Sequence, residues 1–383
     1  MQRSNIFLID HPGLHTLLLP LMRALKEAQQ NVMALVCDHG IAGPLAQEGF
    51  PYVTQFEELQ HLARRMGEHS VFITASDQQF MAHKRGREFV QLAKLHGFPT
   101  VSIQHGPFAL VERQNQDVVS DSSLLFTFGR AEYDFFHSLG MEEDRLVITG
   151  CPKYDELNRV SLSSDSSRSN KILVLGALHT QQIICNYSRE ECAELLFRVL
   201  SALKKDHPDS TLYVKPHPAE VTSVYELLPL YQDVISRFSA DDVVLVDASD
   251  SFLGYARESK FVVSFSSSSI VELLLINRPV LYINEYYYAR TNRVLRQLQQ
   301  MKAVAVMQSA EFLKGTDVEL PELSIDILDE NAQDVRNVLM QLNFMNDGNA
   351  CARMVALISR LGAVKEIETI DGVPRIFCAP NPQ

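Results

Sequence analysis

The sequence predicts an α/β protein with two Rossmann-like domains. Three observations lead to this fold class. Apolar strand candidates alternate with amphipathic helix candidates along residues 6–149, a serine-rich segment interrupts the pattern at residues 160–170, and a similar series begins at residue 171. A chain of 383 residues, of which 46% are hydrophobic, is also long enough to form two cores.

The first half of the chain supplies a series of strand, loop and helix units. Strands are expected at residues 6–9, 32–36, 71–74, 100–103, 124–128 and 146–149. Helices are expected at about residues 15–29, 84–96 and 131–139, and another is expected to end near Gly49. Such a series is typical of a parallel sheet with helices on both faces.

Residues 160–170 mark the expected boundary between the domains. Their sequence, VSLSSDSSRSN, contains six serines and little apolar surface, as exposed linkers do. The segment KILVLGALHT then predicts a strand that runs into a glycine-containing loop. Further strands are expected at residues 212–215, 261–264 and 280–283, and helices at about residues 189–206, 268–276, 332–344 and 349–361.

We therefore expect an acceptor-side domain over residues 1–160 and a nucleotide-binding domain over residues 171–345. The two domains are expected to face each other over a central cleft. The last helix and tail, residues 346–383, are expected to pack across both domains.

Composition excludes several classes of protein. The net charge of -12 argues against a general nucleic-acid surface, which needs cations to neutralise phosphates. The six cysteines are scattered without a CxxC pair, which favours reduced thiols over a disulfide framework or a zinc site. No apolar run reaches the length of a membrane-spanning helix, so we expect a cytoplasmic protein. The basic cluster at residues 84–87 gives slight support for peripheral contact with the inner face of a membrane.

Two motifs in the second half predict a nucleotide-phosphate site. In TLYVKPHPAE, a strand ends at Lys215, and two prolines hold His217 on a rigid turn. In FVVSFSSSSIVELLL, four serines precede a helix, where hydroxyls, backbone N–H groups and the helix dipole favour an anion: Ser266, Ser267, Ser268 and Ser269. Glu272, one turn further on, is expected to accept hydrogen bonds from ribose hydroxyls. The alternative is that the serines only cap the helix and His217 only completes a turn.

Strand-end loops of the first half carry the candidates for acid–base chemistry. They are His11 and His15 after the first strand, Asp77 after the third, and His105 in the QHG segment after the fourth. We expect one of them, with His105 favoured, to deprotonate an acceptor hydroxyl, although Asp77 and His15 can equally be capping or surface residues. No Asp-x-Asp pair is placed to hold a metal, so no metal or other cofactor is expected.

Several of these motifs together resemble the GT-B superfamily of bacterial surface-polysaccharide transferases. They are QHG at 104–106, FGRAEYDFFHSLGMEEDRLVITGCPKYDEL, KPHP at 215–218 and SFSSSSIVELLLINRPV. The surface-polysaccharide branch of this superfamily includes CMP-sugar transferases and CDP-glycerol glycerophosphotransferases. The resemblance implies activity-linked histidines at His105 and His217, and nucleotide contacts from His217 and the serine turn.

The resemblance implies a glycosyltransferase that moves a sugar from a cytidine nucleotide, of the CMP-Kdo or CMP-sialic acid type, to a glycan or glycolipid hydroxyl. The alternatives are a CDP-glycerol or CDP-ribitol polyol-phosphate transferase, a UDP-sugar glycosyltransferase, or a nucleotide-binding module of a capsule assembly complex without turnover. Gln104 and Phe265 depart from the Trp and Asp that glycerophosphotransferases usually carry. The four serines depart from the Ser-Gly-Gly turn of the UDP-GlcNAc 2-epimerases, which disfavours epimerase chemistry.

Overall fold

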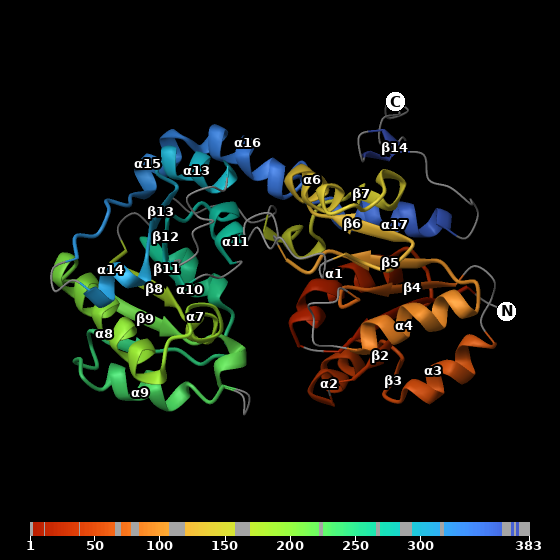
Figure 1. Ribbon diagram of the computed structural model, residues 1–383, viewed down its shortest axis with the longest axis horizontal. Helices are drawn as coiled ribbons and strands as arrows, with labels where there is room; N and C mark the ends of the chain where they lie inside the picture. The colour runs from red at the N-terminus through yellow and green to blue at the C-terminus, as the bar shows by residue number, and fades with distance from the viewer. Residues whose placement is uncertain are drawn as a thin grey trace. The chain divides into compact units, whose positions relative to one another are not determined.

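The computed structural model divides the chain into two compact units (Figure 1). The first contains Met1–Arg159 and Met340–Gln383, and the second contains Val160–Leu339. The structure describes residues 3–10, 12–37, 39–65, 70–77, 84–106, 119–157, 169–221, 225–265, 269–283, 293–314, 318–361, 369–370 and 373–374. His11, Ser266, Ser267 and Ser268 lie outside these residues.

The first unit is built on a parallel sheet, which has seven strands within the described residues, in the order β3-β2-β1-β4-β5-β6-β7. The strands are β1 (Asn5–Ile9), β2 (Val32–Val36), β3 (Tyr52–Val53), β4 (Val71–Thr74), β5 (Thr100–Ile103), β6 (Leu124–Thr127) and β7 (Leu146–Ile148). The order reverses between β1 and β4, because β1 pairs with both β2 and β4. The carboxyl ends of β1 and β4 therefore flank the topological switch point of this sheet.

Helices join these strands and bury apolar faces against them. They are α1 (Pro12–Glu27), α2 (His39–Gln47), α3 (Phe56–Ala63), α4 (Lys84–Leu95), α6 (Arg130–Ser138), and the short 3-10 turns η2 (Glu143–Arg145) and η3 (Pro152–Tyr154). From the end of the chain come α17 (Ala350–Leu361) and the hairpin β14 (Thr369–Ile370) and β15 (Val373–Pro374). Asp155 holds the start of α17 by accepting hydrogen bonds from the N–H groups of Ala350 and Cys351, at 2.8 and 2.7 Å.

The second unit repeats this plan with a parallel sheet in the order β10-β9-β8-β11-β12-β13. Its strands are β8 (Lys171–Leu175), β9 (Thr211–Lys215), β10 (Val243–Leu245), β11 (Phe261–Phe265), β12 (Val280–Ile283) and β13 (Val304–Met307). Its helices are α7 (Leu178–Cys185), α8 (Arg189–Asp206), η6 (Pro218–Val221), α9 (Leu228–Ile235), α10 (Phe252–Glu258), α11 (Ile270–Leu275), α13 (Arg293–Gln300), α14 (Ser309–Lys314), α15 (Ile325–Glu330) and α16 (Ala332–Leu342), the last of which contains the boundary between the units. Here the switch point lies between β8 and β11.

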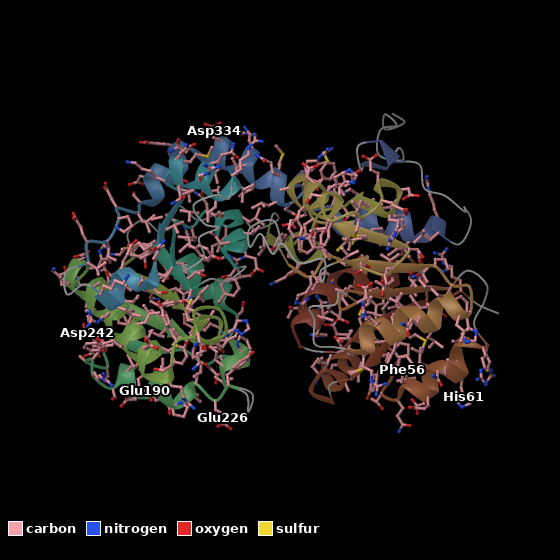
Figure 2. All side chains as sticks on the ribbon, in the orientation of Figure 1. Phe56, His61, Glu190, Glu226, Asp242 and Asp334 are labelled. Atoms are coloured by element: carbon pink, nitrogen blue, oxygen red, sulfur yellow. The ribbon has the colours of Figure 1, made fainter. Side chains whose placement is uncertain are left out.

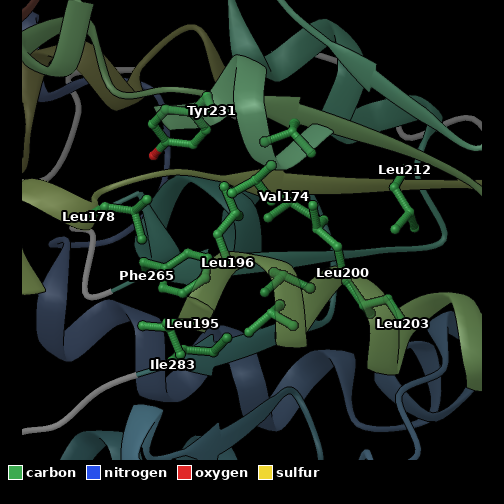
Figure 3. Packing of buried hydrophobic residues seen from close by; sticks show 14 of the residues in the cluster. Val174, Leu178, Leu195, Leu196, Leu200, Leu203, Leu212, Tyr231, Phe265 and Ile283 are labelled. Atoms are coloured by element: carbon green, nitrogen blue, oxygen red, sulfur yellow. The ribbon is translucent and has the colours of Figure 1, made fainter. Parts of the chain in front are cut away.

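Helix α8 shows how local sequence and core packing agree. Ser188 and Glu191 form a capping box at its start, and Lys204 and Lys205 complement the dipole in its last turn. Its leucines recur at helical spacing and pack toward Val174 and Phe265 of the sheet (Figure 3). The face of α8 that points away from the core carries polar side chains, and Glu190 on this face is exposed (Figure 2).

The fold class predicted from the sequence is confirmed: both units are doubly wound, Rossmann-like α/β domains. The cleft expected between them, and the packing of residues 346–383 across both, stay predictions. Within the described part of the chain, no helix combines the length and the apolar character needed to span a bilayer.

Candidate functional site

Strands β8, β9 and β11 of the second unit have their carboxyl ends side by side at the switch point of the sheet. Leu175 of β8 pairs with Lys215 of β9 on one side and with Ser264 of β11 on the other. After Leu175 and Lys215, the chain leaves the sheet at this edge, in the segments that begin at residues 176 and 216. In doubly wound folds, ligands bind at this edge, so His217 and Ser269 lie where a nucleotide site is expected.

A buried carboxylate joins two of these segments. Glu220 of η6 is fully buried, and its Oε1 accepts hydrogen bonds from the backbone N–H of His179 at 2.8 Å and from its Nδ1 at 3.1 Å. Its Oε2 accepts from the backbone N–H of His217 at 2.8 Å and from the Tyr231 hydroxyl at 2.7 Å. Burial alone would raise the pKa of Glu220, but the bonds from His179 and Tyr231 outweigh it and lower the pKa. One charged group therefore fixes the loop after β8 against the turn after β9.

The two histidines at this carboxylate lie against each other. The ring centroids of His179 and His217 are 4.8 Å apart, and the ring of Tyr225 lies 4.9 Å from that of His179. His217 is exposed, whereas only 12% of the His179 side chain is accessible. The structure thus brings a second imidazole to the predicted phosphate site.

Close packing of Tyr231 against the loop after β8 depends on Gly176. A Cβ at this position would lie 2.0 Å from the Tyr231 hydroxyl oxygen and 3.1 Å from Oε2 of Glu220. Because Gly176 has no side chain, Tyr231 can pack against this loop and donate its hydroxyl hydrogen bond to Glu220.

Lys215 anchors the neighbouring loop. Its Nζ donates to the carbonyl oxygen of Ala248 at 2.6 Å, and the side chain is buried. Burial lowers the pKa of the ammonium, while the carboxylates of Asp250 and Asp247 oppose this shift. A cation thus lies at the carboxyl end of β9, one residue before the histidine turn.

Of the serine motif, the structure describes Ser269, which immediately precedes α11. The Ser269 hydroxyl lies 3.4 Å from that of Ser264, and its carbonyl accepts the first helical hydrogen bond, from Leu273. Glu272, predicted to meet a ribose, lies in the first turn of α11 and is 3% exposed. The role of the motif in binding phosphate stays a prediction.

In the first unit, Asp77 occupies a cage of serines. Its fully buried carboxylate accepts hydrogen bonds from the hydroxyls of Ser102, Ser120 and Ser122 at 2.6, 2.6 and 2.8 Å, and from the backbone N–H of Ser122 at 3.2 Å. These bonds join the loops that follow β4 and precede β6 to strand β5. Such contacts suit a residue that holds the loops together, and its predicted role as a base stays untested.

His105 follows β5 and is partly exposed. It is positioned by Gln104, whose Oε1 accepts from the backbone N–H of Phe128 at 2.8 Å and whose amide donates to the Gly106 carbonyl. His15 lies near the start of α1, where burial lowers its pKa against the opposing effect of Glu48. The QHG segment thus presents an imidazole on a loop fixed to the next strand.

His179, Glu220 and Tyr231 were not predicted from the sequence as site residues. Two of them had a readable signal: Glu220 ends the KPHPAE motif, and His179 follows the GAL turn after a buried strand. No signal pointed to Tyr231, which comes from a helix that was not predicted. Among the described residues, no group of three or more His, Cys, Asp and Glu side chains is arranged to hold a metal ion.

The chain matches no protein-family model and no curated protein sequence. It is similar in structure to MnaA of S. aureus bound to UDP, with a TM-score of 0.62 and 14% identity over 95% of this chain and 98% of that one. The UDP-GlcNAc 2-epimerase of Methanocaldococcus jannaschii, in complex with UDP-GlcNAc and UDP, has a TM-score of 0.59 and 12% identity over 94% and 99% of the two chains. A glycosyltransferase from Rickettsia africae ESF-5 has a TM-score of 0.53 and 9% identity over 94% and 99%. At these identities the likeness shows the fold, which is GT-B.

Proposed function

We propose that the protein is a nucleotide-sugar-dependent glycosyltransferase whose second unit binds the nucleotide. The observation that carries the proposal is the pairing of Leu175 with both Lys215 and Ser264 at this edge, where Glu220 holds the imidazole of His179 and the backbone N–H of His217. Donors and cations gathered at a switch point are the groups that bind phosphate. Structures of similar fold contain UDP, which supports a nucleotide ligand for this chain as well.

The proposed mechanism divides the work between the two units. In the second unit, His217 donates a hydrogen bond to the leaving phosphate, and Lys215 offsets part of the charge that develops on it. In the first unit, His105 accepts the proton of the acceptor hydroxyl as that oxygen attacks the anomeric carbon. The bond between the anomeric carbon and the phosphate oxygen breaks, and the nucleotide leaves with the electron pair. Asp77 holds the loops of the first unit through its serine contacts.

The finer assignment concerns the donor and the acceptor. The resemblance of the KPHP and serine motifs to CMP-sugar transferases favours a cytidine donor, of the CMP-Kdo or CMP-sialic acid type. The UDP in structures of similar fold makes a UDP-sugar the competing donor. For the acceptor we propose a hydroxyl of a surface glycan or glycolipid, reached at the inner face of the membrane.

A thermal-shift screen with CMP, CDP, UMP, UDP and GDP tests the nucleotide and its base. A ligand at a hundred times its dissociation constant adds about 2.7 kcal/mol to the free energy of unfolding, which raises the melting temperature by several degrees. We expect a shift with cytidine nucleotides that exceeds the shift with UDP. A larger shift with UDP would replace the cytidine assignment, and no shift with any nucleotide would refute the proposed function.

Epimerisation of a UDP-sugar is the second candidate, because the chain aligns over 94% or more of its length with UDP-GlcNAc 2-epimerases. NMR analysis of UDP-GlcNAc incubated with the protein distinguishes the two reactions. An epimerase inverts the configuration at C2 without an acceptor, whereas a transferase leaves that carbon unchanged and releases nucleotide in proportion to product. Binding without either reaction would favour a nucleotide-binding module.

A further inference from the structure

His179 lies at the phosphate site but has no part in the mechanism proposed above. It stands in the first turn of α7, directly after the loop from β8, and 12% of its side chain is accessible. Its backbone N–H and its Nδ1 both bond to the same oxygen of Glu220. Two bonds to one buried carboxylate fix both the position of the residue and the orientation of its ring.

The hydrogen bonds distinguish the protonation behaviour of the two imidazoles. Nδ1 of His179 faces an ionised carboxylate and therefore carries a proton, so Nε2 accepts a proton whenever the ring becomes an imidazolium. Nδ1 of His217, in contrast, accepts a hydrogen bond from the N–H of Ala219 at 3.2 Å. Protonation of His217 at Nδ1 would break that bond, so His217 favours the neutral ring that donates from Nε2.

Among the described residues, Glu220 is the carboxylate that bonds to His179. Tyr231 of α9 is neutral, because burial and the adjacent Glu220 raise the pKa of its hydroxyl. Cys192 of α8, which also interacts with Glu220, is neutral because burial raises its pKa to about 12. The rings of Tyr225 and His217 both contact the His179 ring in tilted arrangements. An anion that arrives at this pair of rings would meet one imidazole whose Nδ1 is already bonded to a carboxylate.

We propose that His179, oriented by Glu220, is a second phosphate-binding imidazole and takes up a proton when a nucleotide binds. This inference rests on the proposed function, since it names the ligand chemistry of the same site. The bound phosphate supplies a negative charge beside Nε2, while Glu220 supplies one beside Nδ1, so the imidazolium is stabilised from both sides. His217 donates as a neutral ring, and the pair therefore presents two N–H groups to one phosphate.

The proposal predicts the pH dependence of nucleotide affinity. A ligand that binds with proton uptake binds more tightly where protons are more abundant, so we expect nucleotide affinity to fall as the pH rises. The charge of the phosphate drives the effect. A nucleoside without phosphate is therefore expected to bind weakly and without proton uptake.

Isothermal titration calorimetry of the wild-type protein with UDP and CMP tests the proposal without any variant. Titrations at pH 7.5 in two buffers of different ionisation enthalpy give the number of protons taken up, which we expect to approach about one per nucleotide. Nucleotide binding without proton uptake would overturn this inference alone. Absence of binding by any nucleotide would overturn the proposed function and this inference together.

Substitutions of the two histidines identify the residue that takes up the proton when a nucleotide binds. In His179→Asn, the side-chain amide keeps the donor to Glu220 but cannot titrate, and we expect proton uptake to vanish and affinity to fall by about 10- to 100-fold. His217→Ala should lose affinity but keep the proton uptake. The matched control is His207→Asn, since His207 lies beside Lys260 at the opposite end of the sheet, and it should behave like the wild type. If His179→Asn retains wild-type proton uptake and affinity while its melting temperature is unchanged, the proposal is wrong.

Discussion

Substitution of Gly176 by alanine is expected to destabilise the second unit through one identified contact. The new Cβ would lie 2.0 Å from the Tyr231 hydroxyl oxygen, and an ordinary van der Waals contact begins at 3.4 Å, so the hydroxyl must move by about 1.4 Å. The movement breaks its 2.7 Å hydrogen bond to Glu220, at a cost of about 1.5–3 kcal/mol. Displacement of the buried ring adds about 1–3 kcal/mol of strain, and we expect a total near 3–5 kcal/mol.

A double-mutant cycle with Tyr231→Phe isolates the contact. The phenylalanine variant loses the same hydrogen bond, so the bond is lost only once in Gly176→Ala/Tyr231→Phe. The double variant should therefore be more stable than the sum of the single effects predicts, by about 1.5–3 kcal/mol. Gly254→Ala is the matched control, because Gly254 lies on α10 with no atom within 4 Å of an added Cβ, and helix propensity should make it slightly more stable.

Urea denaturation followed by circular dichroism measures these changes, since the chain contains no tryptophan. The two units can unfold in separate steps, so hydrogen exchange of α9 peptides should accompany each titration. Equal stability of Gly176→Ala and Gly254→Ala, or additive effects of Gly176→Ala and Tyr231→Phe, would contradict the contact between Gly176 and Tyr231.

Three further predictions concern the candidate residues. Asp77→Asn should destabilise the first unit by about 2–4 kcal/mol in urea denaturation, because several serine donors lose a charged acceptor. Asp121→Asn, which changes an exposed carboxylate, should not destabilise it. Equal effects of the two substitutions would contradict the serine cage. The lowered pKa of Glu220 means that its contribution to stability is complete above its ordinary value of 4.5 and is lost as the pH falls through the folded value. Glu220→Gln should therefore flatten the fall of the melting temperature below that pH, and an unchanged acid profile would refute this assignment. Single-turnover kinetics should show that His105→Ala lowers the transfer rate by roughly 100-fold with nearly unchanged nucleotide affinity. His217→Ala should instead weaken nucleotide binding by about 1.5–3 kcal/mol. The reverse pattern would exchange the roles of the two units.

Elements with a strong local signal were predicted well from the sequence. Strands β2, β4, β5 and β12 have the predicted bounds, because each is a short apolar run between polar or turn-forming residues. Helix α8 also begins and ends where predicted, at its capping box and at the lysines of its last turn. The ends of α11 were predicted less closely, since the helix spans Ile270–Leu275 where a helix over about residues 268–276 was expected.

Elements that depend on tertiary packing were missed. Helices α7, α9 and α10 are short, and their apolar residues become informative only when they meet the core of the sheet. For the same reason, the link from Glu220 to His179 was not predicted, since the two residues are 41 positions apart and a buried carboxylate is recognisable only by what surrounds it. The sequence placed His217 at a strand end correctly, but its partner imidazole required the register between β8 and β9.

Hydrogen-exchange mass spectrometry with and without saturating nucleotide tests most directly whether the second unit holds the phosphate. The account predicts that CMP or UDP slows exchange in peptides that span residues 176–181, 215–221 and 261–275, and that His217→Ala abolishes this protection at the same nucleotide concentration. Protection confined to the first unit, in peptides around residues 100–106, would contradict the central claim.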